Sequence, residues 1–365
     1  ARHNGIRSHT MKPIPVILWL LLSPAGLTGQ FYSQGEDPAS VAWESIQTDH
    51  FHVVYPAEFY HEANRFANLL EYYRPYTSRG LNHLPAKIPV VIHTRSVRSN
   101  GFVSWAPKRM EIVALPDRGN YNQDWLEQLA LHEYRHVVQI DKFRQGMTRG
   151  LSWVFGEMVT GAASAYMTQW FLEGEAVLNE TALSRGGRGR LPSFDMPLRA
   201  AVSDTAKKFT YDQVFLGSYR YKIPDHYQYG YHMVSYARLR EGPLFWSRAI
   251  DFAARNPYLP APLPVYSLRR TGLNREGIYR KTMDSLHWIW TSQPGPRDET
   301  QDTLVMANTA KHFRQYKWPQ PMRDDRIIAL KTGTDIRDQL VCIDRSGKEK
   351  KLLEIGESDE LNLSA

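Results

Sequence analysis

Short apolar runs and one amphipathic segment make up residues 43–116. The segment 57–78 repeats apolar residues at intervals of three and four, which predicts a helix with one buried face. The runs around it have the length and the stop signals of β-strands. These runs are 51–56, 88–93, 102–105 and 110–114. We therefore expect a small α/β unit in which the last two strands form a hairpin.

From residue 122 to about residue 290 the apolar spacing is that of helices. Asp124 precedes the first apolar positions and Glu127 follows it by three residues, a combination typical of a helix N-terminus. This helix is expected to run to about Ile140. Further helical patterns cover 170–183, 230–240, 244–255 and 274–290. This part of the chain is expected to form a mainly helical lobe.

Two segments interrupt the helical patterns. Residues 150–166 are apolar and rich in small residues. We expect them to be buried beneath neighbouring helices, and contact with a membrane is the alternative. Residues 184–190, Ser-Arg-Gly-Gly-Arg-Gly-Arg, are expected to form a flexible basic loop. Binding of an anionic lipid or glycan by Arg185, Arg188 and Arg190 is a further hypothesis for this loop.

The pattern changes after residues 292–303, a polar stretch with proline and glycine that is typical of a linker. Short strands follow at 325–331, 339–344 and 351–355. The predicted fold class is therefore α+β. A small α/β lobe and a mainly helical lobe form one domain over 43–291, and an all-β tail covers 304–365.

The first thirty residues have the features of an export signal. Met11-Lys12 is followed by the apolar run 14–22 and then by small and polar residues, which is the order found in a secretory signal peptide. The run is too short to span a bilayer comfortably. Residues 1–10 precede the expected initiator methionine. We expect the protein to cross the inner membrane and to stay in the periplasm or at the outer membrane.

Composition narrows the possible classes. Of the 365 residues, 42% are hydrophobic and 23% are charged, values typical of globular proteins. The formal net charge of +7 is spread along the chain without a nucleic-acid-binding motif, so no nucleic-acid partner is expected. The single cysteine, Cys342, excludes an intramolecular disulfide and a cysteine-rich zinc site. A metal ion would need His, Asp or Glu ligands.

One short motif combines metal-ligand side chains, His132-Glu133-Tyr134-Arg135-His136. Two histidines four residues apart on a helix project from one face toward one point. Glu133 lies beside them, where it is placed to accept a proton from water rather than to bind the metal. We predict a Zn²⁺ site with His132 and His136 as ligands and Glu133 as general base. The alternative is two partly exposed histidines beside an ordinary acid.

Downstream, residues 170–176, Trp-Phe-Leu-Glu-Gly-Glu-Ala, resemble the Trp-x-x-Glu-Gly-x-Ala motif of the gluzincins, the thermolysin- and aminopeptidase N-like metallopeptidases. The resemblance implies that Glu173 is the third zinc ligand. Glu180 lies seven residues later on the same helix face, where it is placed to orient a ligand histidine. Glu175 is the rival ligand, but it lies on a different face from Glu180, and we expect a solvent-facing charge. The motif around His136 does not continue as His-x-x-Gly-x-x-His, which argues against a metzincin.

A second motif resembles the same family. His226-Tyr227-Gln228-Tyr229-Gly230 is similar to its Tyr-x-x-Gly helix start, which implies that the hydroxyl of Tyr227 stabilises an oxyanion. Aromatic packing is the alternative role. No Gly-x-Met-Glu-Asn motif precedes the metal helix, and the insert 150–166 lengthens the interval before the third ligand. Both departures favour an endopeptidase or a divergent hydrolase over an aminopeptidase.

The closer likeness is to envelope-associated peptidase MA-like proteins of Bacteroidetes-type bacteria, which join a gluzincin domain to a TolB-like β-propeller. It covers about residues 43–365 and rests on 132–139, His-Glu-Tyr-Arg-His-Val-Val-Gln, and on 187–196, Gly-Arg-Gly-Arg-Leu-Pro-Ser-Phe-Asp-Met. The tail resembles one propeller blade. Because one blade cannot close a ring, we expect either a fragment of a longer protein or a small sheet.

The resemblance implies a zinc metallopeptidase that acts on a peptide or protein substrate, with envelope proteins as partners of the tail. The edge of the strand pair 103–114 offers main-chain groups to an extended substrate, and completion of the sheet is the alternative role. The competing function is a non-catalytic binding or assembly module that keeps the same fold as a scaffold.

Overall fold

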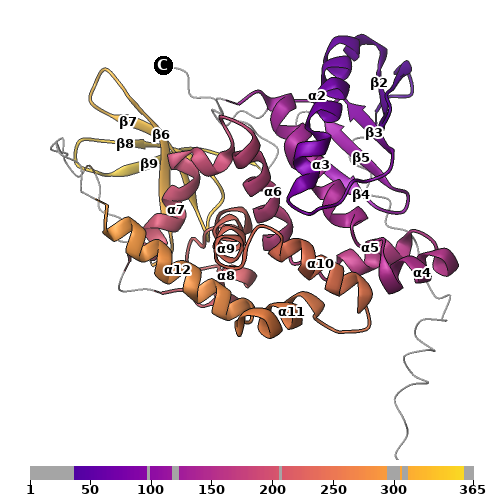
Figure 1. Ribbon diagram of the computed structural model, residues 1–365. Coiled ribbons are helices and arrows are strands. Elements are labelled where there is room, and N and C mark those ends of the chain that lie inside the picture. Colours follow the sequence, from indigo (N-terminus) through magenta and orange to yellow (C-terminus); the bar gives the residue numbers. More distant parts are fainter. Residues whose placement is uncertain are drawn as a thin grey trace, which may run out of the picture.

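The computed structural model describes residues 37–96, 99–116, 123–204, 208–293, 305 and 311–356. The first part is a five-stranded sheet of order β1-β2-β3-β5-β4 (Figure 1). The central pairs β2–β3 and β3–β5 are parallel, and the outer pairs β1–β2 and β4–β5 are antiparallel. The strands are β1 (Trp43–Gln47), β2 (Phe51–Pro56), β3 (Ile88–His93), β4 (Asn100–Ser104) and β5 (Arg109–Val113).

A crossover connects the parallel strands β2 and β3, as parallel pairing requires. It consists of η1 (Ala57–Phe59) and α2 (Tyr60–Arg79). Alternate residues of the two strands are buried, and α2 buries positions three and four apart. The predicted helix and strands of this region are confirmed. The structure adds β1, whose side chains are mostly exposed, so it has little apolar periodicity.

The helical lobe is built around three helices, with α6 packed between α3 and α9 (Figure 1). These are α3 (Trp125–Asp141), α6 (Gln169–Leu183) and α9 (His226–Glu241). The surrounding helices are α4 (Gly146–Phe155), α5 (Met158–Ser164), η2 (Arg188–Arg190), α7 (Pro192–Ser203), α8 (Tyr211–Leu216), α10 (Phe245–Arg255), α11 (Pro262–Thr271) and α12 (Arg275–Thr291). One continuous cluster of buried apolar side chains extends from the first sheet to α12.

Helices α3, α6, α9, α10 and α12 cover the segments where the apolar pattern predicts them. At the start of α3, the Asp124 side chain accepts a hydrogen bond from the Glu127 backbone N–H at 3.1 Å, as the N-terminal signal indicates. The prediction omits α7, α8 and α11. Proline at the first turn of α7 and α11 is compatible with a helix but hides the helical period.

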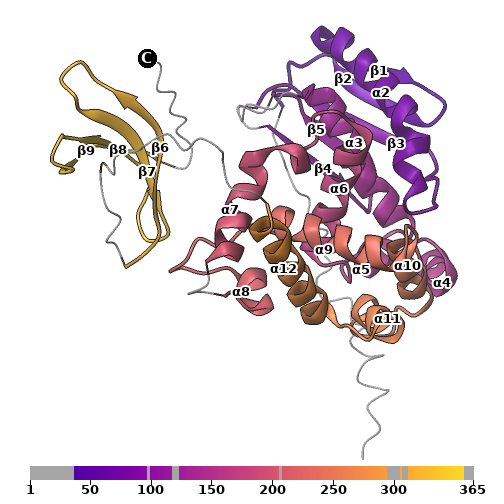
Figure 2. The ribbon, with the colours of Figure 1, turned by 60° about the vertical axis from the view of Figure 1, so that its left-hand side comes forward.

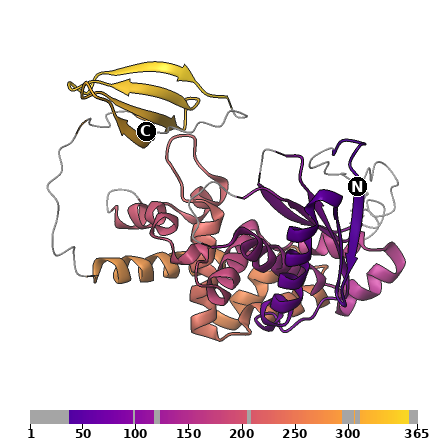
Figure 3. The same cartoon turned by 90° about the horizontal axis from the view of Figure 1, so that it is seen from above.

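A second, four-stranded antiparallel sheet has the order β6-β7-β8-β9. It lies beside the helical lobe (Figures 2 and 3), and the Phe313 backbone N–H before β6 donates a hydrogen bond to the Arg220 carbonyl at 3.2 Å. Its strands are β6 (Arg314–Pro321), β7 (Ile327–Gly333), β8 (Gln339–Ile343) and β9 (Glu349–Glu354). The small core contains Ala329, Val341 and Ile343. The prediction omits β6, which contains two prolines and has no buried residue.

The α+β class is thus confirmed. The predicted signal segment 1–30 and most of the predicted linker 292–303 lie outside the described residues. Among the helices of the described residues, none has both the length and the apolarity needed to cross a membrane.

The expected burial of 150–166 is wrong for most of the segment, since only Thr160 and Ala163 are buried. These residues form most of α4 and α5, and large apolar side chains of both helices face outward. The one residue of α4 that is buried, Thr148, donates a hydrogen bond to the Ala254 carbonyl at 2.9 Å. Only one side of α4 is therefore held against the lobe, and its apolar content does not enter the core.

Candidate metal centre

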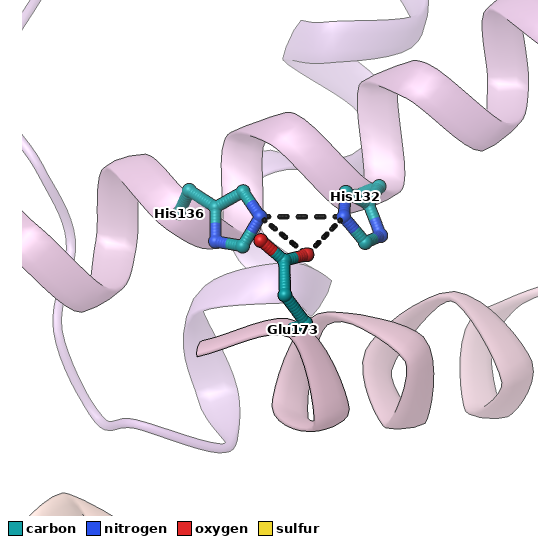
Figure 4. A group of neighbouring side chains, drawn as sticks. All are labelled: His132, His136 and Glu173. Atoms are coloured by element: carbon teal, nitrogen blue, oxygen red, sulfur yellow. Dashed lines mark hydrogen bonds and ion pairs between the residues drawn. The ribbon is translucent and has the colours of Figure 1, made fainter. Parts of the chain in front are cut away.

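Three side chains converge between α3 and α6 (Figure 4). The Nε2 atoms of His132 and His136 are 3.2 Å apart. Oε2 of Glu173 lies 3.1 Å from the first of them and 3.4 Å from the second. A tetrahedral ion with bonds of about 2.05 Å separates its ligand atoms by about 3.4 Å. The three atoms therefore stand at the spacing of one face of a tetrahedral coordination sphere, and the group can hold a metal ion.

Helix α3 supplies both histidines from one face, and α6 supplies the carboxylate across the helix interface. A buried ion pair links the two helices beside the centre, because Arg135 donates from Nε and Nη2 to the two carboxylate oxygens of Glu175. The expectation that Glu175 is a solvent-facing charge is therefore wrong. Helix α6 is covered on several faces, so a face that does not point to the metal centre is still buried.

Two glycines bring α9 close to α6. A Cβ atom at Gly174 would lie 2.2 Å from the backbone carbon of Gly230, and a Cβ at Gly230 would lie 2.2 Å from the carbonyl oxygen of Trp170. No side chain fits at either position without moving the helices apart. Gly174 directly follows Glu173, so this close crossing sets the distance between the carboxylate and the N-terminal turn of α9.

Each histidine has a partner at Nδ1, which leaves Nε2 directed at the centre. Nδ1 of His132 lies 3.0 Å from Glu180 Oε2, and Nδ1 of His136 lies 2.8 Å from Gln139 Oε1. Gln139 is fixed in turn, since its amide nitrogen donates to the Leu172 carbonyl at 3.0 Å. Nη2 of Arg188, which can only donate, also lies 2.6 Å from Nδ1 of His132. When Nδ1 carries the proton and donates it to the acceptor beside it, each ring presents its Nε2 lone pair to a metal.

Glu180 is fully buried and is neutralised by Arg188. The guanidinium donates to Glu180 Oε1 from Nε at 2.7 Å and to Oε2 from Nη2 at 3.0 Å. Burial acts to raise the pKa of Glu180, but Arg188 and His132 outweigh it and lower the pKa to about 2. The expectation of a flexible loop is therefore wrong at Arg188, which belongs to η2. Arg190 also has a protein partner, the Thr181 carbonyl, and Arg185 is exposed.

The centre is negatively charged at its ligand carboxylate and attracts protons to its histidines. Burial lowers the pKa of His136, but Glu173 more than compensates and raises it to about 9. Burial and Arg188 also act to lower the pKa of His132, yet Glu173 and Glu180 leave it raised. Burial raises the pKa of Glu173, and the two histidines lower it well below its usual range. Without a metal, protonated histidines balance the negative charge of the Glu173 carboxylate.

Glu133 lies beside the three ligands with only 4% of its surface exposed. Its Oε2 atom is buried and has no hydrogen-bond partner among the described residues. Burial raises the pKa of Glu133, and the neighbouring histidines act against this shift. Strand β4 passes next to the carboxylate, because a Cβ at Gly101 would lie 2.7 Å from Glu133 Cδ and Oε1. A carboxylate with a free buried oxygen and a raised pKa is suited to take a proton.

Tyr227 lies at the first turn of α9, which is capped by Asp225 and Gln228. Its ring is 6.3 Å from the His132 ring, and Arg188 stands over it at 5.0 Å. Burial and the charge of Glu173 raise the pKa of Tyr227 above its ordinary value of 10, so the hydroxyl stays protonated. The structure therefore places Tyr227 at the centre as a neutral hydrogen-bond donor.

Sequence reasoning missed several residues around the centre. Gln139, Arg188 and Gly101 contact a predicted site residue. The fourth, His226, packs against Tyr227 with the ring centroids 4.6 Å apart and the ring planes tilted by 34°, and its Nε2 is buried without a hydrogen-bond partner among the described residues. A glycine within a strand can mark a close approach of another group, so Gly101 alone carried a usable signal.

Two comparisons with known proteins add no assignment: no protein-family model matches the chain, and no curated protein matches it.

Proposed function

We propose that this protein is a zinc-dependent peptidase of the gluzincin type. The observation that carries the proposal is the arrangement of Glu133 beside the triad His132, His136 and Glu173. Three ligand atoms at tetrahedral spacing and a buried carboxylate with a free oxygen are the parts that metal-assisted hydrolysis needs. A purely structural zinc site would close its fourth position with another protein ligand.

The chemistry of the donors favours zinc. Two imidazole nitrogens and one carboxylate oxygen suit Zn²⁺, whereas Ca²⁺ and Mg²⁺ prefer oxygen ligands throughout. When bound, zinc supplies Lewis acidity and lowers the pKa of water at the site. Partners at Nδ1 of both histidines support this assignment, because zinc-bound histidines usually donate their other ring proton.

The chain's own groups have separate tasks in hydrolysis. Glu133 accepts the proton of the attacking water and later delivers it to the leaving amine. The Tyr227 hydroxyl donates a hydrogen bond to the substrate carbonyl oxygen as negative charge develops there. The neighbouring His226 is a second candidate donor at the same place, since its Nε2 has no other partner among the described residues.

An extended peptide is the substrate that the surroundings favour. Strand β4 is the edge of its sheet, since β5 is its only partner among the described strands, and Gly101 in this strand adjoins Glu133. A peptide added along β4 would gain main-chain hydrogen bonds and pass close to the centre. We propose an endopeptidase, since no sequence motif for gripping a substrate amino terminus precedes α3.

The second sheet, β6 to β9, is the basis for what we propose about the tail, its partners and the location of the protein. Four antiparallel strands in sequential order are the content of one propeller blade. We propose that this sheet belongs to a TolB-like propeller that contacts envelope proteins, and that the protein is exported to the periplasm or outer membrane. A non-catalytic binding module with the same scaffold is the alternative function.

The experiment combines metal analysis with cleavage. Purified protein is expected to hold about one equivalent of zinc and to cleave members of a broad peptide library. Glu133→Gln should keep the zinc and lose at least about 1,000-fold in hydrolysis. Glu62→Gln, at an exposed position of α2, is the matched control and should change neither property. A folded preparation that binds no zinc would refute the proposal, and zinc without cleavage would support the binding module.

A further inference from the structure

Helices α4 and α5 carry a concentration of large exposed apolar side chains. We call these six residues the α4–α5 patch. They are Met147 (47% exposed), Leu151 (37%), Trp153 (78%), Val154 (74%), Phe155 (60%) and Met158 (48%). Single exposed apolar residues are common on protein surfaces, but six within twelve positions are not. A cluster of this kind is typical of a surface that contacts a membrane or another protein.

The patch projects from the body of the protein. Helix α4 lies at the periphery of the helical lobe (Figures 1 and 2), where it packs against α5 and α10. It is attached along one side through Thr148, and Ser152 lies 3.2 Å from Thr160 of α5. Both polar contacts fall on the inner side. The outer side and the C-terminal end of α4 are therefore left to the apolar residues.

The arrangement of the patch fits a fluid apolar medium better than a protein groove. Trp153, Val154 and Phe155 are consecutive, and successive residues of a helix point about 100° apart. A groove or a second copy of the chain contacts one face of a helix, so it would leave one of these three side chains in water. The interior of a lipid bilayer surrounds an inserted helix end on all sides. Tryptophan in particular is favoured at the boundary between headgroups and acyl chains.

The charged residues around the patch indicate which lipid headgroups it would contact. Arg144, Arg149 and Arg255 are exposed at the base of α4, and none of them forms an ion pair within the described part of the chain. The guanidinium of Arg149 stands over the Trp153 ring at 5.7 Å. The one exposed acid of the segment, Glu157, accepts a hydrogen bond from the Lys108 backbone at 3.2 Å. A basic rim around apolar side chains is complementary to anionic headgroups.

We propose that the α4–α5 patch inserts into the surface of a bilayer that contains anionic lipids, with the arginines at the headgroups. The inserted segment directly follows the metal helix α3. It also adjoins the β4–β5 hairpin, since a Cβ at Gly161 would lie 3.4 Å from the Trp105 carbonyl. Docking therefore holds the β4 edge and the metal centre close to the membrane surface. The inference stands on the surface alone and is independent of the proposed peptidase activity.

Vesicle co-sedimentation with the full chain tests the proposal. Wild type is expected to bind vesicles of phosphatidylcholine with about one-quarter phosphatidylglycerol at least about tenfold more tightly than pure phosphatidylcholine vesicles. The combined variant Trp153→Ser, Val154→Ser, Phe155→Ser should lose about tenfold or more on the anionic vesicles. The matched control is Leu239→Ser with Trp288→Ser, which removes exposed apolar side chains from α9 and α12. An equal loss in the control, or none in the patch variant, overturns the proposal.

A probe at the patch separates its insertion from binding by any other part of the chain. Because Cys342 is the only cysteine, Cys342→Ser provides a background for single labelling. An environment-sensitive NBD fluorophore on Val154→Cys should brighten about twofold or more and shift to shorter wavelength with anionic vesicles. The same fluorophore on Leu239→Cys should not. Vesicle-bound protein without a change at position 154 refutes the proposal, as does sedimentation of the free protein as a dimer that the triple serine variant dissociates.

Discussion

The contact between Gly101 and Glu133 allows a sharp test of how the proposed general base is positioned. In Gly101→Ala, the three atoms nearest to the added methyl all belong to Glu133, at 2.7 to 2.8 Å. Carbon atoms pack at about 3.5 Å or more, so the carboxylate must retreat by about 0.8 Å or change its rotamer. A misplacement of about 1 Å in a catalytic group costs up to about 100-fold in rate. We expect kcat/KM to fall between about tenfold and 100-fold, which corresponds to about 1.4 to 2.7 kcal/mol.

The assay measures kcat/KM on a peptide substrate together with bound zinc and thermal stability. Zinc content should be unchanged, because the added methyl meets none of the three ligands first. The control is Gly150→Ala, where no atom lies within 4 Å of the added methyl, and it should have wild-type activity. If Gly101→Ala keeps full activity, the carboxylate of Glu133 does not act from the position seen in the structure. If it loses its zinc, the assumed separation of base and ligands is wrong.

The remaining predictions concern the supports of the centre and its protons. Gly174→Ala should lower the free energy of unfolding by about 3 kcal/mol or more, because its Cβ would meet the Gly230 backbone at 2.2 Å. A denaturant titration measures this loss, and a loss of less than about 1 kcal/mol would contradict the close crossing of α6 and α9. Glu175→Ala leaves Arg135 buried without its carboxylate partner, so the same titration should show a free energy of unfolding lower by about 3 to 5 kcal/mol. Wild-type stability of this variant would mean that the pair is not buried. Zinc binding should tighten as pH rises from 6 to 8, by about tenfold per unit for each proton released, because the pKa of His136 is about 9 without metal and zinc requires the neutral ring. Calorimetry in buffers of different ionisation enthalpy measures this release, and binding at pH 7 without a released proton would refute the assignment.

Local pattern was enough to predict much of the fold and part of the centre. Strands β2, β3, β4 and β5 and helices α3, α6, α9, α10 and α12 follow from the apolar pattern, because burial of one face imposes a period on neighbouring residues. The spacing of His132 and His136 likewise places both rings on one side of α3, and Glu173 and Glu180 share one side of α6. These relations involve residues within two helical turns, where backbone geometry alone sets the directions.

The properties that required the tertiary structure all depend on residues distant in sequence. Glu175 is paired with Arg135 and Glu180 with Arg188 because α6 is enclosed by several elements, which no single-helix pattern reveals. The approach of Gly101 to Glu133 depends on how β4 packs against the middle of the metal helix α3. The apolar character of α4 pointed to the core, yet Trp153 is 78% exposed. A sequence determines how apolar a segment is, but only the packing of the other elements decides whether room remains for it inside.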